Sequence, residues 1–304
     1  MAESAEKSPI FVAGGTGQVA LSLREAAENA GFPLVAAGRP DFDLTSAASV
    51  RAAIDAYNPS AIINAAAYTA VDAAENDKEQ AFAINATGAA TLAAIAAERN
   101  IPFLHLSTDY VFDGNKASPY DETDAVGPTG VYGQSKLAGE RTVLKANPKS
   151  LILRTAWVYS PYGKNFLKTM LSLSERNVLS VVADQHGNPT YAPDIAAALL
   201  AILARLDGQE PTDTQAGIYH MTGSGETTWH GFASQIFDEG ARFGLARPEV
   251  KAIPTADYPT PAKRPANSRL NCEKLSKNFN ISLPGWREST ALCVKRLSEM
   301  GQLG

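Results

Sequence analysis

Cysteine and histidine are scarce in this chain of 304 residues. The two cysteines, Cys272 and Cys293, do not form a Cys-x-x-Cys motif, which excludes a disulfide framework and a cysteine-based zinc site. The four histidines lie far apart in the sequence and lack the spacing of metal ligands. The composition therefore predicts a protein of a reducing compartment, the cytoplasm.

Dense basic clusters and long apolar runs are also missing. Lys and Arg number 27 against 32 Asp and Glu, a net charge of −5, and no stretch concentrates the cations that duplex nucleic acid attracts. The longest apolar runs, such as 192–204, contain a charge or fall short of the roughly 18 residues of a membrane span. Residues 1–8 are polar and lack the apolar segment of a secretory signal. We therefore expect neither a nucleic acid nor a membrane as a partner.

Hydrophobic residues make up 45% of the chain and charged residues 19%, which predicts a globular protein with a sizeable core. Up to about Arg154, β-rich runs alternate with alanine-rich stretches of helical spacing. The expected strands are Ile10–Ala13, Pro33–Ala37, Ala61–Asn64, Pro102–Leu106 and Leu151–Arg154. The expected helices are Gln18–Asn29, Ala47–Tyr57, Lys78–Arg99 and Tyr132–Lys145. This alternation indicates βαβ units and a parallel sheet.

The second half is less regular. Ala192–Leu206 predicts a helix and Ile218–Met221 a strand, both on the same sheet, whereas prolines between Pro248 and Pro284 interrupt regular structure. We predict an α/β domain over 9–156, to which 181–222 returns. A smaller, loop-rich C-terminal lobe for the substrate is expected over 157–180 and 223–304.

The first expected strand runs directly into the loop Gly14-Gly15-Thr16-Gly17-Gln18-Val19-Ala20. Small residues allow a tight turn and a close approach to a pyrophosphate, and the following helix directs its N-terminal amides at that charge. Glycines also form ordinary turns, but a preceding strand and a following helix supply the context that the dinucleotide motif requires. We therefore predict a Rossmann-type doubly wound sheet that binds a dinucleotide through Gly14, Gly17, Gln18 and Val19.

The end of the second expected strand indicates which dinucleotide is bound. It leads into Gly38-Arg39 and carries no acidic residue. An acid there would hold the ribose 2′-hydroxyl of NAD, whereas an arginine suits the 2′-phosphate of NADP. Arg39 therefore favours NADPH, with NADH as a second cofactor; a solvated loop arginine is the alternative. Asp43 and Leu44 are expected to flank the adenine.

Tyr132 and Lys136 lie on the same face of an expected helix. A neighbouring cation stabilises a phenolate and lowers the tyrosine pKa from about 10, which suits a carbonyl reductase that must deliver a proton as hydride arrives. Such a pair also arises by chance on exposed helices. Here it follows the fourth strand, which ends at the hydroxyl of Thr108, on the edge where open sheets bind ligands.

The glycine loop, the strand-end hydroxyl and the Tyr-Lys pair together resemble the extended short-chain dehydrogenase/reductase family. Finer motifs extend the resemblance from Ile10 to about Leu297. They are similar to those of family members that act on nucleotide sugars. These motifs are Ser107–Gly114, Val131–Glu140, Leu153–Tyr159, Asn165–Met170, Asp184–Tyr191 and Arg264–Leu270. The resemblance implies that a monomer or homodimer reduces the C-4 keto group of a dTDP-ketosugar with NADPH.

The resemblance also implies roles by position. Thr108 matches the hydroxyl that bonds the keto oxygen, Tyr132 the proton donor, and Lys136 the residue that tunes Tyr132 and holds the nicotinamide ribose. The loop after the third strand, Ala65, Ala66 and Ala67, matches a segment along the cofactor. Further substrate contacts are expected from Val71, Asp72, Asp109, Trp157, Asn165 and Arg264.

Two of these residues have alternative interpretations. Trp157 is expected to supply an apolar wall for the deoxyhexose, and a core aromatic is the alternative. Arg264 fits a diphosphate clamp, because a guanidinium forks onto phosphate oxygens; a surface salt bridge is the alternative.

Two positions depart from the family pattern. Ala20 replaces the third glycine, where only a small side chain is needed. Some members bind magnesium between subunits through glutamates, and one matching position here holds Ser22, so no metal is predicted.

Two other functions remain open. A nucleotide-sugar epimerase or dehydratase would keep its cofactor bound, although dehydratases usually follow Thr-Asp with Glu, where this chain has Tyr110. A regulatory subunit of the methionine adenosyltransferase type would bind without turnover, although Thr108, Tyr132 and Lys136 are all present.

Overall fold

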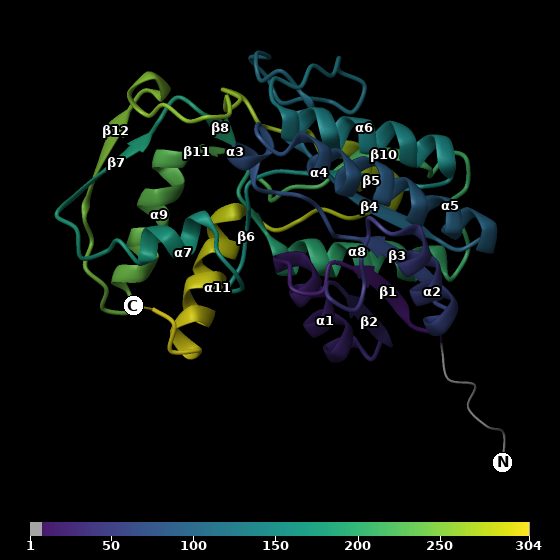
Figure 1. Cartoon of the computed structure of the whole chain (residues 1–304). Coiled ribbons are helices and arrows are strands. Elements are labelled where there is room, and N and C mark those ends of the chain that lie inside the picture. The colour runs from purple at the N-terminus through teal and green to yellow at the C-terminus, as the bar shows by residue number, and fades with distance from the viewer. Residues whose placement is uncertain (1–7, 304) are drawn as a thin grey trace.

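The computed structural model describes residues 8–303, so most of the polar segment 1–8 lies outside the described residues. A larger part is built on a six-stranded sheet, and a smaller part lies beside it (Figure 1). All strands of the sheet are parallel, in the order β10-β5-β4-β3-β1-β2. They are β1 (Ile10–Ala13), β2 (Leu34–Ala37), β3 (Ala61–Asn64), β4 (Phe103–Thr108), β5 (Leu151–Thr155) and β10 (Gly217–His220). The predicted α/β fold is confirmed.

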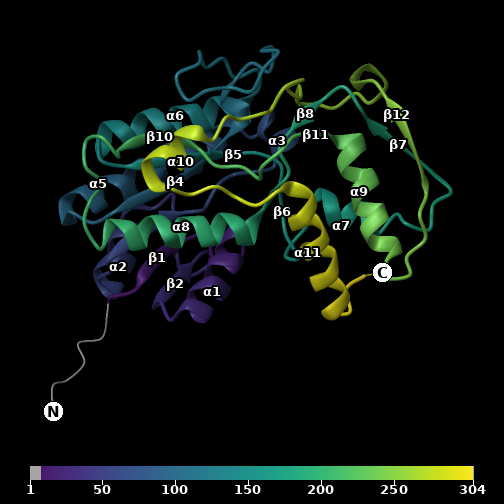
Figure 2. The ribbon, with the colours of Figure 1, turned by 180° about the vertical axis from the view of Figure 1, so that it is seen from behind.

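Helices cover both faces of the sheet. One face carries α1 (Gln18–Ala30), α8 (Ala192–Leu206) and α10 (Glu273–Phe279), of which α8 and α10 stand out in Figure 2. The other carries α2 (Ala47–Tyr57), α5 (Ala89–Arg99) and α6 (Val131–Ala146). Because successive strand residues point to opposite faces, Phe11 and Val12 of β1 belong to two separate apolar clusters.

The order of the strands positions a ligand site. β1 lies between β2 and β3, so the sheet grows in both directions from this point. In such sheets the crevice at the carboxyl ends of the strands binds ligands. Asn64 at the end of β3 pairs with Ala13 of β1 on one side and His105 of β4 on the other. The loops that follow these strands therefore converge on one edge.

The helix expected over 78–99 contains an irregular turn. It consists of α4 (Lys78–Phe82), a π-helical segment (Ala83–Gly88) and α5. The buried Asn85 in this segment accepts a hydrogen bond from the Tyr68 N–H (2.8 Å) and donates one to the Ser135 hydroxyl (2.9 Å). The wider turn thus ties the loop after β3 to α6, and apolar periodicity does not reveal it.

By length and composition alone, the stretch Lys78–Arg99 would be able to cross a membrane. Half of its most apolar window is buried inside the protein. Leu92, Ala93 and Ala96 pack in the apolar cluster on the sheet. This stretch is therefore a core helix.

The smaller part has its own core. The parallel pair β7 (Val178–Val182) and β12 (Glu249–Ile253) lies against α9 (Trp229–Ala241), beside α7 (Phe166–Leu171) and α11 (Trp286–Glu299). Phe232, Phe237 and Leu167 lie at the centre of this cluster. Two short pairs complete it: β6 (Val158–Tyr159) with β9 (Thr190–Tyr191), and β8 (His186–Gly187) with β11 (Thr227–Thr228).

The division between the two parts differs from the expected one in two places. Val181 and Tyr191 pack in the core of the smaller part, so the chain returns to the sheet at α8 and not at residue 181. α10 lies within the range expected for the lobe, yet Leu275 and Phe279 pack against the sheet. Both differences arise because apolar side chains are buried against the segments that lie close in the folded chain, and sequence position does not show which segments these are.

Candidate active site

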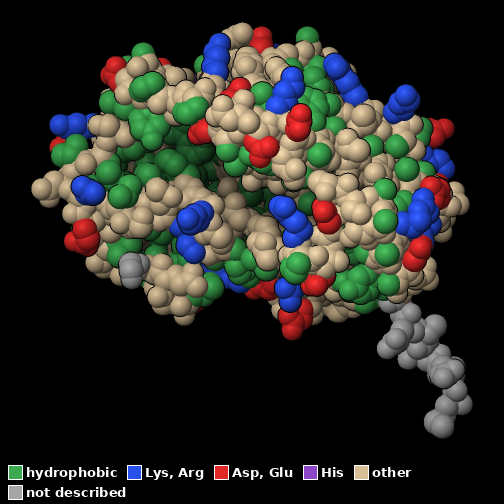
Figure 3. Space-filling model, viewed as in Figure 1, with side chains coloured by type: hydrophobic (Ala, Val, Ile, Leu, Met, Phe, Trp, Pro, Cys, Tyr) green, Lys and Arg blue, Asp and Glu red, His purple; other side chains and the backbone are tan. Residues whose placement is uncertain are grey.

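Two cavities lie at the carboxyl ends of the strands. The larger, of about 770 Å³, extends from the glycine loop and Arg39 to Tyr132. The smaller, of about 430 Å³, lies toward the smaller part, where Figure 3 shows a hollow lined by hydrophobic side chains. The ring of Tyr132 in the first cavity is 5.4 Å from the ring of Tyr110 in the second. The two cavities are therefore neighbours at the contact of Tyr132 with Tyr110.

The glycine loop packs closely on the loop after β3. Gly14 has a φ of +117°, and a Cβ atom there would lie 3.0 Å from the backbone nitrogen of Ala66. Gly17 caps α1, and no described side chain accepts from the first amides of this helix. Unpaired amides at a helix N-terminus bind anions. Gly14, Gly17, Gln18 and Val19, together with Ala65, Ala66 and Ala67, line the larger cavity.

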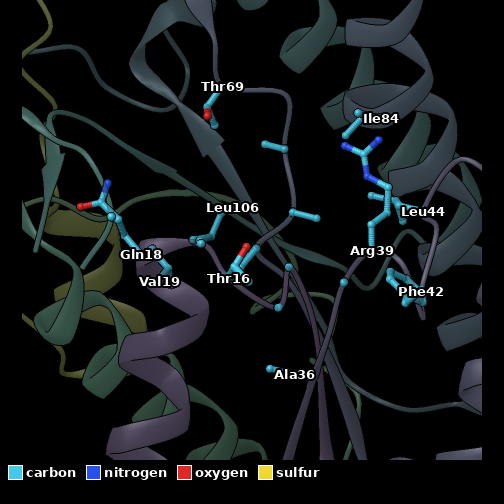
Figure 4. A pocket seen from close by; sticks show the side chains of 18 of the residues that line it. Thr16, Gln18, Val19, Ala36, Arg39, Phe42, Leu44, Thr69, Ile84 and Leu106 are labelled. Atoms are coloured by element: carbon cyan, nitrogen blue, oxygen red, sulfur yellow. The ribbon is translucent and has the colours of Figure 1, made fainter.

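One end of the larger cavity is formed by the residues that follow β2. Figure 4 shows Arg39 and Leu44 at this end and Gln18 at the other. Arg39 forms no ion pair with any residue in the described range. The N–H and hydroxyl of Thr45 bond to Asp43 (2.9 and 2.8 Å) and hold the pKa of Asp43 below its usual range. Asp43 is therefore an ionised acceptor on the cavity wall.

A glycine allows α6 to approach the end of β4. A Cβ atom at Gly133 would lie 2.2 Å from the carbonyl oxygen of Tyr110. Because of this close approach, the half-buried side chain of Tyr132 lies near the hydroxyl of Thr108. Loss of hydration raises the pKa of Tyr132 to about 12, and the hydrogen bond with the Thr108 hydroxyl lowers it in part. The phenol therefore keeps its proton at neutral pH.

Thr108 and Asp109 are both buried beneath the cavities. The Thr108 hydroxyl donates to Oδ1 of Asp109 (3.0 Å) and accepts from the Tyr110 N–H (3.2 Å). Burial raises the pKa of Asp109 to about 6. At neutral pH the carboxylate thus orients the hydroxyl of Thr108.

The ammonium group of Lys136 is buried and faces β4. It donates to the carbonyl oxygen of Leu106 (2.7 Å) and lies 3.5 Å from Nε2 of His105. Burial lowers the pKa of Lys136 to about 8, against a smaller opposite effect of Glu140. We expected Lys136 to lower the pKa of Tyr132, but the pKa of Tyr132 is raised, and Lys136 is not among the groups that shift it. The reason is that the ammonium is directed at the β4 backbone.

His105 connects Lys136 to the loop along the larger cavity. Oδ1 of Asn64 accepts from the Ala66 N–H (3.1 Å), so the Asn64 amide nitrogen faces Nδ1 of His105 (3.1 Å). Burial lowers the pKa of His105 well below its usual range, so the ring is neutral. Sequence reasoning missed His105; its signal was a polar residue within a buried strand.

A buried ion pair fixes α6 against the sheet. Arg154 donates from Nε and Nη2 to the two carboxylate oxygens of Glu140 (2.8 and 2.7 Å), and both side chains are 2% exposed. The Ser107 hydroxyl also donates to Glu140 (2.6 Å). Because Glu140 lies one turn beyond Lys136, this pair holds the turn that carries Lys136.

Aromatic side chains form a wall of the smaller cavity. Trp157 has a left-handed backbone (φ 48°), and its ring stacks on Trp229 with centroids 3.6 Å apart. Gly187 makes room for it, since a Cβ atom there would lie 2.4 Å from Trp157. Phe166 packs on the other tryptophan, 4.6 Å between centroids. Trp157 lines the cavity as expected, whereas Trp229 and Phe166 were not predicted.

Asp72 and Arg264 lie together on the same cavity. Nη2 of Arg264 donates to Oδ2 of Asp72 (2.6 Å), whose Oδ1 accepts from the Ala262 N–H (3.0 Å). Nη1 of Arg264 is buried and has no hydrogen-bond partner within residues 8–303. The guanidinium therefore forms an ion pair and still has a donor available.

Three further positions lie away from the smaller cavity. Asn165 lines neither cavity; its amide donates to Oε1 of Gln18 (3.0 Å) and its Oδ1 caps α7. Val71 is half-buried at the start of α3 (Val71–Ala74) and lines neither cavity. The Ser22 hydroxyl is buried and donates to the Gln18 carbonyl (2.8 Å), so it is not placed to bind a metal.

Comparisons with known proteins agree with this architecture. The family model described as the RmlD substrate binding domain matches residues 8–299. The chain is 49% identical over 286 residues to a dTDP-4-dehydrorhamnose reductase of Sinorhizobium fredii, covering 94% of this chain and 96% of the relative. It is 44% identical over 285 residues to a protein of that name from Escherichia coli K12, covering 91% and 94%.

The solved structures point in the same direction. The crystal structure of dTDP-4-dehydrorhamnose reductase from Bacillus anthracis in complex with NADP matches with a TM-score of 0.87 and 32% identity, covering 95% of this chain and 99% of that chain. A dTDP-4-dehydrorhamnose reductase from Clostridium acetobutylicum also matches with a TM-score of 0.87, at 34% identity, covering 95% and 99%. The resemblance expected from the motifs is confirmed. This chain belongs to the RmlD family of dTDP-4-dehydrorhamnose reductases.

Proposed function

We propose that the protein is an NADPH-dependent reductase of the C-4 keto group of dTDP-4-dehydro-6-deoxy-L-mannose, which yields dTDP-L-rhamnose. The observation that carries the proposal is the contact between Tyr132, which lines the larger cavity, and Tyr110, which lines the smaller one. A dinucleotide in the first cavity and a sugar nucleotide in the second would approach each other at this contact. The names of the relatives and the NADP complex of a family member support the same activity.

The larger cavity fits a dinucleotide phosphate. Gly14 leaves space that a Cβ atom would fill, and the uncapped amides of α1 are available to a diphosphate. Arg39 stands where a 2′-phosphate would be read. NADPH, when bound, supplies the hydride. Lys136, which lines the same cavity, would hold the nicotinamide ribose.

The smaller cavity fits a sugar nucleotide. The available Nη1 donor of Arg264 would bind a diphosphate oxygen, since phosphate accepts strong charge-assisted hydrogen bonds. Asp72 keeps this guanidinium in place. The stacked pair Trp157 and Trp229 provides a flat apolar wall for a deoxysugar or a base.

Tyr132 is the proton donor in this proposal. As the keto carbon is reduced, its oxygen becomes an alkoxide, a stronger base than a phenolate, so the proton moves from Tyr132 to it. A pKa of about 12 keeps that proton on the phenol until the oxygen requires it. The Thr108 hydroxyl, whose orientation is fixed by its bond to Asp109, would contact the same keto oxygen.

We also propose that the reaction takes place in the cytoplasm, where Cys272 and Cys293 stay free thiols, as they are in the structure. The expected monomer or homodimer would form without the bridging magnesium, because the buried Ser22 replaces one glutamate.

The test is turnover with the defined ketosugar. Purified protein is mixed with dTDP-4-dehydro-6-deoxy-L-mannose and NADPH, loss of NADPH absorbance is recorded, and the product is identified by NMR. One NADPH consumed per dTDP-L-rhamnose supports the proposal. An altered sugar without NADPH consumption would indicate an epimerase or dehydratase instead. NADPH binding without any turnover would indicate a regulatory subunit.

A further inference from the structure

A segment of the smaller part, residues 160–165, lies against the glycine loop. Oε1 of Gln18 accepts hydrogen bonds from the Ser160 hydroxyl (2.8 Å) and from Nδ2 of Asn165 (3.0 Å). Nδ2 of Asn165 also donates to the carbonyl oxygens of Ser160 and Tyr162. The two ends of the segment are thus fixed to the first residue of α1.

The same segment is held at a second place on α1. The Tyr162 hydroxyl donates to Oε2 of Glu25 (2.8 Å), and the Arg296 guanidinium donates to both oxygens of that carboxylate (2.7 Å each). These contacts join three regions of the chain that are far apart in sequence. The segment therefore has a defined position beside the N-terminus of α1.

Lys164 lies between these fixed points. It lines the larger cavity together with Gly17, Gln18 and Val19. Its side chain is exposed, and it forms no ion pair with the residues that the structure describes. The preceding Gly163 has a left-handed φ of 61° and turns the chain toward Gln18.

The other charged residues of the cavity lie elsewhere. Arg39 lies at the end formed after β2 (Figure 4), where Asp41 and Asp43 also line the cavity. The ammonium of Lys136 is buried and bonded to the Leu106 carbonyl of β4. Among the lining residues in the described range, Lys164 is thus the cation that accompanies the glycine loop. This loop is the place where the α1 amides would meet a diphosphate.

We infer that Lys164 binds the diphosphate of the dinucleotide, so that the smaller part supplies a ligand to the cofactor as well as to the substrate. This inference rests on the proposed function, because it requires a dinucleotide in the larger cavity. The ammonium of Lys164 carries a full positive charge, which adds to the partial positive charges of the amides at the N-terminus of α1 in attracting a diphosphate. Since the side chain is exposed, solvent screens part of the interaction.

The test compares cofactors that share the diphosphate and differ in the 2′-phosphate. Dissociation constants for NADPH and NADH are measured by calorimetry for wild type, Lys164→Met and Lys164→Arg at low and high salt. We expect Lys164→Met to weaken both cofactors by the same factor, about two- to five-fold at low salt, and less at high salt. Lys164→Arg should retain most of the affinity.

Lys149→Met is the matched control, because the Lys149 ammonium bonds to Glu210 and does not line the cavity. Unchanged constants for both cofactors in Lys164→Met would overturn the inference. Weakening of NADPH alone would place Lys164 at the 2′-phosphate, and weakening of dTDP alone would place it on the substrate; either overturns it too. If wild type bound neither cofactor, the proposed function itself would fail.

Discussion

The buried ammonium of Lys136 donates to the carbonyl oxygen of Leu106 over 2.7 Å. Burial lowers the pKa of Lys136 from 10.5 to about 8, so the folded protein holds this proton less strongly than the unfolded chain does. Burial of the charged ammonium therefore opposes folding. We attribute its presence to its role in the site.

Replacement of Lys136 by Met should therefore stabilise the fold while it impairs turnover and cofactor binding. Below pH 8 the lysine is charged in both states, and its burial opposes folding by up to about 3 kcal/mol. As the pH rises from about 8 toward 10.5, only the unfolded chain stays protonated, so this cost decreases. Urea unfolding should give a larger free energy of unfolding for the variant than for wild type at both pH 7 and pH 9.5. The difference should be smaller at pH 9.5.

Lys145→Met, an exposed position on the same helix, is the control and should change stability little at either pH. A Lys136→Met variant less stable than wild type at pH 7 would show that the bond to Leu106 outweighs the cost of burial.

Replacement of Tyr132 by Phe keeps the ring and removes the proton. We expect turnover to fall by about two to four decades, the usual effect of losing a general acid, with NADPH affinity nearly intact. Tyr110→Phe, on the neighbouring ring, should cost much less, because its hydroxyl does not bond to Thr108. Single-turnover kinetics measures both. If Tyr132→Phe retained more than about a tenth of wild-type turnover with hydride transfer rate-limiting, another group would be the acid.

Replacement of Arg39 by Ala should change the cofactor preference. Loss of a guanidinium at the 2′-phosphate is expected to raise KM for NADPH roughly ten-fold and to spare NADH. Steady-state kinetics with both cofactors measures this, with Arg141→Ala, an exposed position on α6, as the control. Equal effects on the two cofactors would argue against a 2′-phosphate contact.

Replacement of Arg264 by Ala should weaken the substrate far more than the cofactor. A charge-assisted bond to phosphate contributes about 1.5–3 kcal/mol, or about one to two decades in affinity. Because Arg264 also pairs with Asp72, Asp72→Asn separates the two roles: it disrupts the ion pair and leaves the guanidinium. Titration with dTDP should show a clearly larger loss for Arg264→Ala. The same loss in both variants would assign the effect to the ion pair.

Much of the larger part follows from local sequence patterns. The strand Ile10–Ala13 and the helices Ala47–Tyr57 and Ala192–Leu206 have the predicted bounds. Alternation, apolar spacing and terminal residues act over a few positions, so they can be read without the tertiary structure. The glycine loop is of the same kind, because its turn lies between adjacent elements.

The site residues were predicted less evenly. Trp157 and Arg264 line the smaller cavity, but Asn165 bonds to Gln18 beside the larger one. Trp229, which lines the smaller cavity, and His105, which contacts Lys136, were not predicted. The identity of a residue shows which bonds it can form. It does not show which partner from a distant part of the chain will be within reach.

The sequence by itself therefore determined the α/β class, the dinucleotide loop and the Tyr132–Lys136 pair, since each depends on neighbours along the chain. Only the tertiary structure decided the direction of the Lys136 ammonium, the π-helical turn at Asn85 and the return of α10 to the sheet. It also brought Ser160 to Gln18. These features depend on packing between distant segments, where burial and available hydrogen-bond partners select one arrangement among many that the local pattern permits.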